Sequence, residues 1–389
     1  MKYSKEQQEA INTIDGQVCI ISVAGSGKTS VIVARANNII KSGVRPYRIL
    51  VLTFSKAAAV QMADRYKMQY GSDGIRFSTI HSLCYSVLAR AYNLKAEDIL
   101  SESGRLKFFT EFHRQLLYKR VSGVPDDFDE YYRKCNEYIN SMAVGTADIQ
   151  DSKSSSKAYL EITFSQYKEF KKNNKKLDFD DMLTMCWELF CERKDILSAW
   201  QRKYQYLLVD EFQDINRLQY EIVKLLALPE NNLFIVGDDD QSIYRFRGAK
   251  PEIMLGFEKD YPGCQRVLLG TNYRSAKEIV ETSLRLIGHN QVRFPKELVP
   301  ARGAGRPVQL KIFENPLREM DAAARALRSY REAGYAWSEM AVLFRTGANL
   351  GLLAEKLMEY NIPFCLRDGV PSIYSHWIAR DFFSYLTLG

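Results

Sequence analysis

The segment SVAGSGKT (Ser22–Thr29) has the residue types and spacing of a loop that wraps around a polyphosphate. An apolar run precedes it and a helical pattern follows, so backbone N–H groups at the helix start would point at the anion. Lys28 would bridge the β- and γ-phosphates, and Thr29 would place its hydroxyl on Mg²⁺. The strict motif has glycine at Ser22, and the alternative is a glycine-rich turn with a chance Gly-Lys-Thr. The predicted phosphate site comprises Ser22, Val23, Ala24, Gly25, Ser26, Gly27, Lys28 and Thr29.

Two adjacent carboxylates end the apolar run in LLVDEFQD (Leu207–Asp214). A phosphate loop requires an acidic partner that holds the metal and orients the attacking water. Asp210 is placed to ligate Mg²⁺ through water, and Glu211 to act as general base on the attacking water. Acid pairs at strand ends are often only solvated loop residues, but the upstream phosphate loop favours a role in phosphate chemistry.

A third segment, IVGDDDQSIYRFRGA (Ile235–Ala249), runs from a strand pattern through three aspartates into mixed aromatic and basic residues. Rings interleaved with arginines suit single-stranded nucleic acid, because bases stack on the rings and cations follow the phosphates. Its position directly after a strand strengthens this interpretation, since α/β sheets bind ligands at that edge. The residues concerned are Gln241, Tyr244, Arg245, Phe246 and Arg247.

The elements that must position these segments alternate between strand and helix patterns. Strands are predicted at Val18–Val23 and Ile49–Thr53, and helices at Lys28–Ile40 and from Lys56 to about Tyr70. Strand, helix, strand with fully apolar strands indicates an α/β fold, in which helices cover a parallel sheet. Further strands are predicted at Tyr206–Val209, Leu233–Val236 and Val267–Leu269.

Two changes of pattern divide the chain. Between about 83 and 200, strand-like runs are missing and aromatic and charged residues recur at helical spacing, with a loop at Ser152–Ser156. A third unit begins near Gly270, with strands predicted at Val308–Phe313 and Met340–Phe344. The predicted domains are therefore 1–85 together with 201–269, a helical inserted subdomain at 86–200, and 270–389.

Composition limits the class of protein. The 389 residues, 46% hydrophobic and 26% charged, predict a globular chain of two or three domains. A formal net charge of +7 permits nucleic acid as a partner without requiring it. Seven cysteines without paired or zinc-binding spacing indicate reduced thiols in a cytoplasmic protein. A polar N-terminus and the lack of a long apolar run predict neither a secretory signal nor a membrane span.

In order and spacing, the motifs resemble the UvrD/Rep/PcrA type of superfamily 1 DNA helicase, and the resemblance covers the whole chain. The matching segments are YSKEQQEAI (3–11), AGSGKT (24–29), LTFSKAA (52–58), STIHS (78–82), LDFDDML (177–183), VDEFQD (209–214), VGDDDQSIYRFRGA (236–249) and TNYRS (271–275). The resemblance implies a RecA-like P-loop NTPase domain with a helical insertion, followed by a partial second RecA-like domain. It also implies ATP and Mg²⁺ as cofactors and DNA as the substrate.

Matches to the family's motifs imply individual roles. Gln7 resembles the glutamine that recognises adenine, and Tyr273 the aromatic residue that stacks on it. Gln241 resembles the glutamine that senses the γ-phosphate, and Arg274 an arginine finger that offsets charge developing on the transferred phosphate. The positions that match the family's single-strand groove are Phe54, Thr79, His81, Tyr244, Phe246 and Arg247.

The sequence departs from the family at several points. Ser30 stands where an arginine is usual, Ile80 where an aromatic residue is usual, and Phe246 where tryptophan is frequent. These helicases are longer, and the family's last motifs have no counterpart before Gly389, so we expect an N-terminal portion of a helicase. Lys168–Lys176 (KEFKKNNKK) is interpreted as a solvated face in preference to a duplex contact.

The function that the resemblance implies is an ATP-dependent 3′-to-5′ DNA helicase or translocase that acts on single-stranded and tailed duplex DNA. One alternative is an ATP-responsive single-strand-binding fragment that does not unwind. Another is an unrelated P-loop NTPase, which would leave Ile235–Ala249 unexplained. His81 has the alternative of a structural histidine, and Phe54 that of an ordinary core ring. Neither the pathway nor any protein partner follows from the residues.

Overall fold

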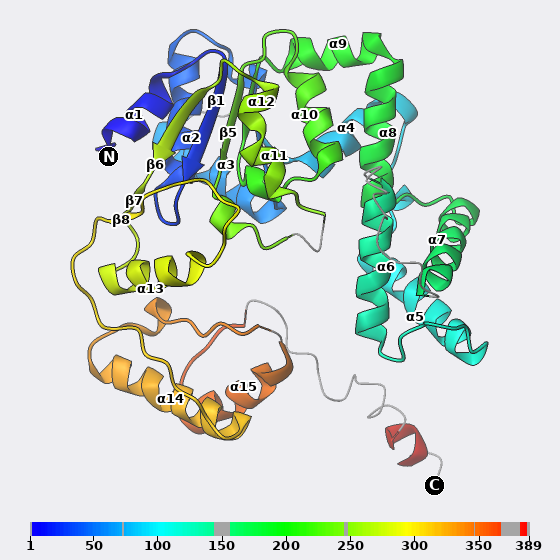
Figure 1. Cartoon of the computed structure of the whole chain (residues 1–389), viewed down its shortest axis with the longest axis vertical. Coiled ribbons are helices and arrows are strands. Elements are labelled where there is room, and N and C mark those ends of the chain that lie inside the picture. The colour runs from blue at the N-terminus through cyan, green and yellow to red at the C-terminus, as the bar shows by residue number, and fades with distance from the viewer. Residues whose placement is uncertain are drawn as a thin grey trace. The chain divides into compact units, whose positions relative to one another are not determined.

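The structure, a computed structural model, describes residues 2–71, 74–143, 156–244, 248–345, 347–366 and 382–386 (Figure 1). The chain divides into two units, residues 1–307 and residues 308–389. Each unit has a hydrophobic core of its own. The predicted division at 269/270 stays a prediction, although residues 270–307 group with the first unit.

A six-stranded parallel sheet forms the centre of the first unit, in the order β3-β2-β4-β5-β1-β6. Four of its strands are apolar and buried along nearly their whole length, as expected of a parallel sheet covered on both faces. The prediction of an α/β fold with a parallel sheet is therefore confirmed. The strands are β1 (Gln17–Ser22), β2 (Ile49–Thr53), β3 (Arg76–Thr79), β4 (Tyr206–Val209), β5 (Leu233–Gly237) and β6 (Gln265–Leu269).

Helices cover both faces of this sheet, and successive residues of one strand pack into different cores. Val18 and Ile20 of β1 pack with α1, α2 and α3, whereas Cys19 and Ile21 pack with α4, α10 and α8 (Phe179–Glu192). Side-chain caps at Ser4, Ser55, Thr79 and Asn216 start four of these helices. Their bounds are α1 (Lys5–Asn12), α2 (Lys28–Lys41), α3 (Lys56–Tyr70), α4 (Ile80–Tyr92), α10 (Arg217–Ala227), α11 (Pro251–Leu255) and α12 (Phe257–Asp260).

The inserted segment between β3 and β4 is helical, as predicted. Its helices after α4 are α5 (Glu102–Tyr118), α6 (Phe128–Ala143), α7 (Ser156–Asn173), α8 (Phe179–Glu192) and α9 (Lys194–Lys203). Helices α5, α6 and α7 pack around a separate, largely aromatic core that contains Phe109, Tyr131, Tyr159 and Tyr167. Of the predicted loop at Ser152–Ser156, the last residue begins α7 and the others lie outside the described residues.

Residues after β6 form a smaller parallel sheet of β7 (Thr271–Asn272) and β8 (Val299–Pro300), with α13 (Lys277–Ile287) between the two strands. In the second unit, α14 (Pro316–Glu332) and α15 (Leu350–Glu359) pack through an apolar cluster. No helix among the described residues combines the length and apolarity that crossing a bilayer demands.

The strands predicted at Val308–Phe313 and Met340–Phe344 are wrong, because neither segment forms a strand in the structure. Val308–Phe313 alternates apolar and polar residues and Met340–Phe344 is continuously apolar, and either pattern is typical of a strand. A strand also needs a hydrogen-bonded neighbour. Leu310 is 89% exposed and Ile312 is 90% exposed, so no neighbour covers their apolar side chains within the described part of the unit. The local pattern therefore does not suffice to make a strand here.

Candidate active site

The predicted phosphate loop lies between the end of β1 and the start of α2, at the edge where the parallel strands end. Gly25 and Gly27 have φ angles of +68° and +84°, which favour glycine, and Gly27 is the N-cap of α2. The Ser22 hydroxyl donates to the carbonyl oxygen of Gly237 at 2.7 Å, which ties the loop to β5. The loop therefore presents the start of a 14-residue helix to an anion.

Lys28 reaches from this loop to the acidic residues that follow β4. Its Nζ lies 2.8 Å from Oε2 of Glu211. Burial by itself would raise the pKa of Glu211, but the Lys28 ammonium and the Gln213 amide hold it below its usual range. Glu211 has a φ of +49°, a strained backbone conformation for a non-glycine residue. The two predicted catalytic residues thus meet at the strand ends.

Asp210 is the candidate metal ligand in the same segment. Its Oδ1 is buried and has no hydrogen-bond partner in the described chain. Burial and the neighbouring Glu211 carboxylate raise the pKa of Asp210 to about 7. An unpartnered buried carboxylate oxygen fits a cation, and Thr29 stands beside Lys28 at the start of α2. Mg²⁺ is usually held by one or two protein ligands together with waters and substrate phosphates, so these residues fit it.

Three residues predicted at the nucleotide lie around the phosphate loop. The Gln7 amide is buried, donating from Nε2 to the Ser26 carbonyl oxygen at 2.9 Å while its Oε1 accepts from the Ser4 backbone N–H. Tyr273 is 46% exposed, and its backbone N–H donates to the carbonyl oxygen of Gly25 at 3.0 Å. A Cβ placed on Gly25 would lie only 2.9 Å from the Cβ of Arg274. All three residues therefore lie against the phosphate loop.

Sequence reasoning missed a buried network that joins two of the acidic segments. The Gln213 amide contacts Glu211, Asp214 and the backbone N–H of Asp238. Beyond Asp238, Lys296 makes ion pairs with all three aspartates of the 238–240 loop. A polar residue between the acids of LLVDEFQD was the available signal for Gln213, but no local pattern marks Lys296.

Gln241, the predicted γ-phosphate sensor, lies in this loop after β5. Its Nε2 donates to Oδ2 of Asp238, so the aspartate side chain orients the glutamine amide. The 3₁₀ turn Asp239–Gln241 carries the residue away from the strand end. Because β5 lies between β1 and β4, its end is beside both the phosphate loop and Glu211.

The predicted nucleic-acid residues follow neighbouring strands of the same edge. The rings of Phe54 and Tyr244 stack with centroids 4.6 Å apart and planes inclined by 25°. Thr79 caps α4, where its hydroxyl accepts from the backbone N–H of Ser82. Phe246 and Arg247 lie outside the described residues.

His81, in the first turn of α4, meets the edge of the Phe179 ring, with centroids 5.4 Å apart. Burial lowers the pKa of His81 to about 4. The imidazole is therefore uncharged at neutral pH and could bind DNA only as a neutral hydrogen-bonding or stacking group. Phe179 is 45% exposed and was not predicted to be near His81.

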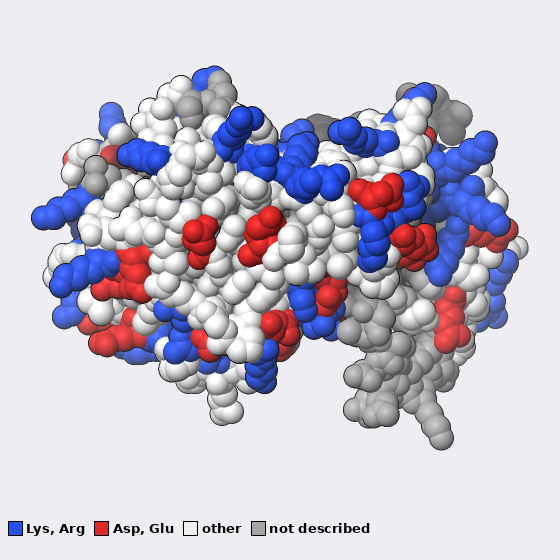
Figure 2. Space-filling view, turned by 90° about the horizontal axis from the view of Figure 1, so that it is seen from above, with Lys and Arg blue, Asp and Glu red and all other residues white. Residues whose placement is uncertain are grey.

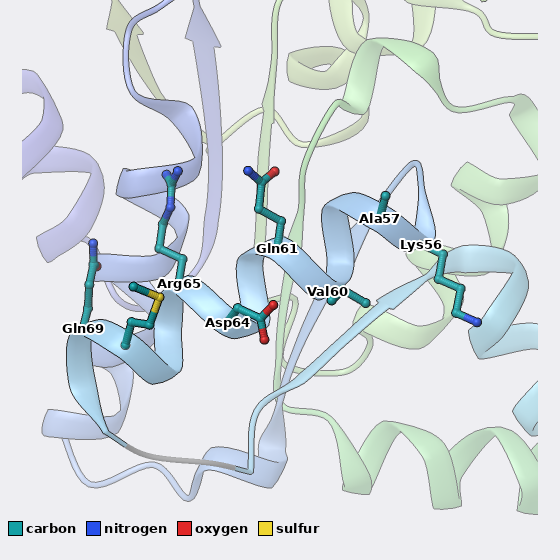
Figure 3. Close-up of a pocket in the computed structure, with 8 residues that line it drawn as sticks. Lys56, Ala57, Val60, Gln61, Asp64, Arg65 and Gln69 are labelled. Atoms are coloured by element: carbon teal, nitrogen blue, oxygen red, sulfur yellow. The ribbon is translucent and has the colours of Figure 1, made fainter. Parts of the chain in front are cut away.

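Two further features of the surface are its distribution of charged side chains and a hollow beside α3. Figure 2 shows Lys and Arg side chains at several places on the face in view, with Asp and Glu side chains among them. A separate hollow follows the side of α3 from Lys56 to Gln69 (Figure 3). All residues that line this hollow belong to α3, and none of them is a site residue described above.

Comparison with known families matches residues 3–262 to the UvrD/REP helicase N-terminal domain and residues 267–388 to the UvrD-like helicase C-terminal domain. The chain is 34% identical over 394 residues to YjcD of Bacillus subtilis (strain 168), covering 98% of this chain and 51% of that protein. It is 32% identical to the ATP-dependent DNA helicase PcrA of Staphylococcus epidermidis over 404 residues, covering 98% and 53%. The PcrA of Leuconostoc citreum is 32% identical over 395 residues, covering 99% and 52%. The chain thus spans about half the length of these curated relatives.

Proposed function

The chain belongs to the UvrD/REP helicase family, and from that premise we propose that it hydrolyses ATP with Mg²⁺ to move 3′-to-5′ on single-stranded DNA and unwind tailed duplexes. The observation that carries the proposal is the contact between Lys28 and Glu211, which brings the phosphate loop to the acidic strand end. A cytoplasmic location is proposed with it.

The residues have distinct parts in hydrolysis. An incoming triphosphate would replace Glu211 as the partner of the Lys28 ammonium, because the β- and γ-phosphates carry more negative charge. The released Glu211 carboxylate would accept a proton from the attacking water. Thr29 and Asp210 would hold Mg²⁺, which neutralises charge on the phosphate oxygens. Arg274 would stabilise the charge that develops on the transferred group.

Gln7 and Tyr273 would bind the adenine end of the nucleotide. For Gln7 this requires exchange of its present hydrogen bonds, since both ends of the amide are engaged within the protein. Tyr273 is half-exposed and presents a ring for stacking. These assignments follow the family resemblance and the positions of both residues beside the phosphate loop.

Single-stranded DNA would cross the edge formed by the ends of β2, β3 and β5. The stacked rings of Phe54 and Tyr244 offer apolar faces to bases, and Thr79 and His81 offer uncharged polar contacts. Phe246 and Arg247 would complete the groove. Translocation requires that ATP favour one arrangement of the groove over another, because a ligand shifts an equilibrium only by its differential affinity.

A second candidate is an ATP-responsive single-strand-binding protein that does not unwind DNA by itself. The observation that favours it is the coverage of only about half of each relative, so parts of a complete motor lie outside the matched length. Both candidates share the nucleotide site and the groove, and differ in the outcome of strand displacement.

The test measures ATP hydrolysis with and without single-stranded DNA, and then displacement on duplexes with a 3′ or a 5′ tail. The helicase proposal expects DNA-stimulated hydrolysis and displacement on the 3′-tailed duplex alone. Stimulated hydrolysis without displacement selects the second candidate. Hydrolysis that is indifferent to DNA contradicts both and leaves a P-loop NTPase of another kind.

A further inference from the structure

We propose that Gln213 and Lys296 are positioning residues that connect the Glu211 carboxylate with the loop carrying Gln241, through Asp238 as their shared partner. The inference rests on the proposed ATP hydrolysis and deepens it by naming groups that orient the base and the γ-phosphate sensor. Gln213 lies within the matching segment VDEFQD and Lys296 in none of the matching segments, and no role was assigned above to either residue.

Gln213 uses its whole amide in this connection. The side chain is buried, with 1% of the residue exposed. Its Nε2 donates to Oε2 of Glu211 at 3.0 Å and to Oδ2 of Asp214 at 3.1 Å, while its Oε1 accepts from the Asp238 backbone N–H at 3.0 Å. A carboxamide has two N–H donors, and both are engaged. An amide can donate on one side and accept on the other, which neither an ionised carboxylate nor an apolar side chain can do.

The space around this amide is restricted. A Cβ added at Gly237 would come within 2.6 Å of Oε1 of Gln213, so the amide lies directly against the bare Cα at the end of β5. This contact holds the amide in one orientation between β4 and β5, which are neighbours in the sheet. The conformation of Glu211 and that of Asp238 are therefore linked through one rigid group.

Lys296 secures the other side of Asp238. Its side chain is 1% exposed, and its Nζ lies 2.5 Å from Asp238, 2.6 Å from Asp239 and 3.0 Å from Asp240. An ammonium has three N–H donors, so three carboxylates can satisfy it completely. Asp238 and Asp239 alone would repel each other, because both side chains are almost fully buried. Lys296 and the backbone N–H of Asp240, which donates to the same Oδ1 at 3.2 Å, thus hold the Asp238 carboxylate in place.

The contacts of Gln213 and those of Lys296 meet at Asp238, which also contacts Gln241. The backbone N–H of Asp238 donates to the Gln213 amide oxygen. The Asp238 Oδ1 accepts from Lys296, and its Oδ2 accepts from the Gln241 amide. Lys296 belongs to the segment between α13 and β8, within the residues matched to the C-terminal family domain. A displacement of that segment would therefore change the positions of both the Gln241 and the Glu211 side chains.

Gln213 acts in its proposed role once Lys28 binds the phosphates of ATP instead of Glu211. Lys28 and Gln213 now share the same oxygen of Glu211, Oε2. Once the triphosphate takes Lys28, the Gln213 amide remains as the partner that orients the carboxylate toward water. The Gln213 amide contacts Glu211, the proposed general base, and none of the residues predicted to bind phosphate. Loss of Gln213 should therefore slow the chemical step more than it weakens nucleotide binding.

The test compares Gln213→Met, Lys296→Met and the double variant with the unaltered chain. DNA-stimulated kcat and KM are measured, together with binding of a fluorescent non-hydrolysable ATP analogue. We expect each single variant to lower kcat by about tenfold or more, part of the 10²–10⁴ that a positioned base contributes. Nucleotide affinity should change by less than about threefold. The double variant should lose little more than the worse single variant, because residues of one connected unit are not additive.

Two matched variants control for loss of buried polar groups. Gln219→Met removes another buried glutamine that caps α10, and Lys171→Met removes a buried lysine paired with Asp178 and Asp181 in the insertion. All variants are assayed below their melting transitions, and both controls should keep kcat within about twofold of the unaltered chain. Should Gln213→Met fail to fold, Gln213→Asn, which keeps the amide but is one methylene shorter, is expected to lower kcat in the same direction.

The outcomes separate the inference from the proposed function. An unaltered kcat in Gln213→Met or Gln213→Asn, or multiplicative losses in the double variant, overturns the positioning role while leaving the ATPase proposal intact. Equal losses in the two control variants would also overturn it, since buried polar groups in general would then account for the effect. If the unaltered chain itself shows no ATP hydrolysis, the proposed function fails and this inference fails with it.

Discussion

Lys28 and Glu211 are 183 positions apart in the chain, yet their side chains meet at 2.8 Å. The contact exists because β1 and β4 flank β5 in the sheet, so the segments that follow these strands emerge at one edge. The Lys28 ammonium is thereby held beside the carboxylate of Glu211, a residue with a strained backbone. The proposed function expects a triphosphate to replace Glu211 as the partner of this ammonium.

Replacement of Lys28 by alanine should abolish ATP turnover. The variant removes the ammonium proposed to bind the β- and γ-phosphates, and we expect hydrolysis to fall by more than about 10²-fold. DNA-stimulated ATPase activity measures the effect. Lys107→Ala removes a lysine of α5 whose side chain is 77% exposed and serves as the control. Turnover equal to that of the control would refute the phosphate-site assignment.

Replacement of Glu211 by glutamine should separate binding from chemistry. The amide keeps the size of the side chain but cannot accept the proton of the attacking water, so kcat should fall by about 10²–10⁴. Binding of an ATP analogue should persist, because Lys28 loses a competing partner and the phosphate loop is unchanged. Analogue titration and single-turnover hydrolysis measure the two quantities. A variant that hydrolyses ATP at the normal rate would exclude Glu211 as the base.

Replacement of Phe54 or Phe246 by alanine should each weaken single-strand binding by about 1–3 kcal/mol, the usual contribution of one stacked base. Fluorescence anisotropy with a labelled oligonucleotide, at one fixed salt concentration, measures the affinity. Tyr118→Ala removes a 90% exposed ring in α5 and is the matched control. Equal affinities for all three variants would place the groove elsewhere.

His81 should make stability dependent on pH below neutrality. Its folded pKa of about 4 lies below the ordinary value of 6.5, so between these pH values the unfolded chain binds more protons than the folded chain. The free energy of unfolding therefore falls as pH decreases from 6.5 toward 4, by up to about 1.4 kcal/mol per pH unit from this group. His81→Gln should flatten that slope in denaturant titrations. The same slope in His81→Gln as in the exposed-site variant His289→Gln would show that folding does not lower the pKa of His81.

Much of the sheet could be predicted from local pattern. The bounds of β2 and β4 agree with the runs ILVLT and YLLV, because strands buried on both faces are continuously apolar. The short strand β3, RFST, was not predicted, since its polar residues give no such run. The segment Val308–Phe313 shows the converse error, a strand pattern without a strand.

The sequence by itself determined which chemical groups this protein has and where each stands relative to a strand or helix end. SVAGSGKT after one apolar run and VDEFQD after another were sufficient to predict a phosphate loop and an acidic partner. The reason is that glycine conformation, strand apolarity and helix starts are properties of neighbouring residues. Only the tertiary structure decided that Gln213, Asp238 and Lys296 form one buried network. Those contacts depend on which strands are neighbours in the sheet and on the return of a distant segment, and no local pattern records either.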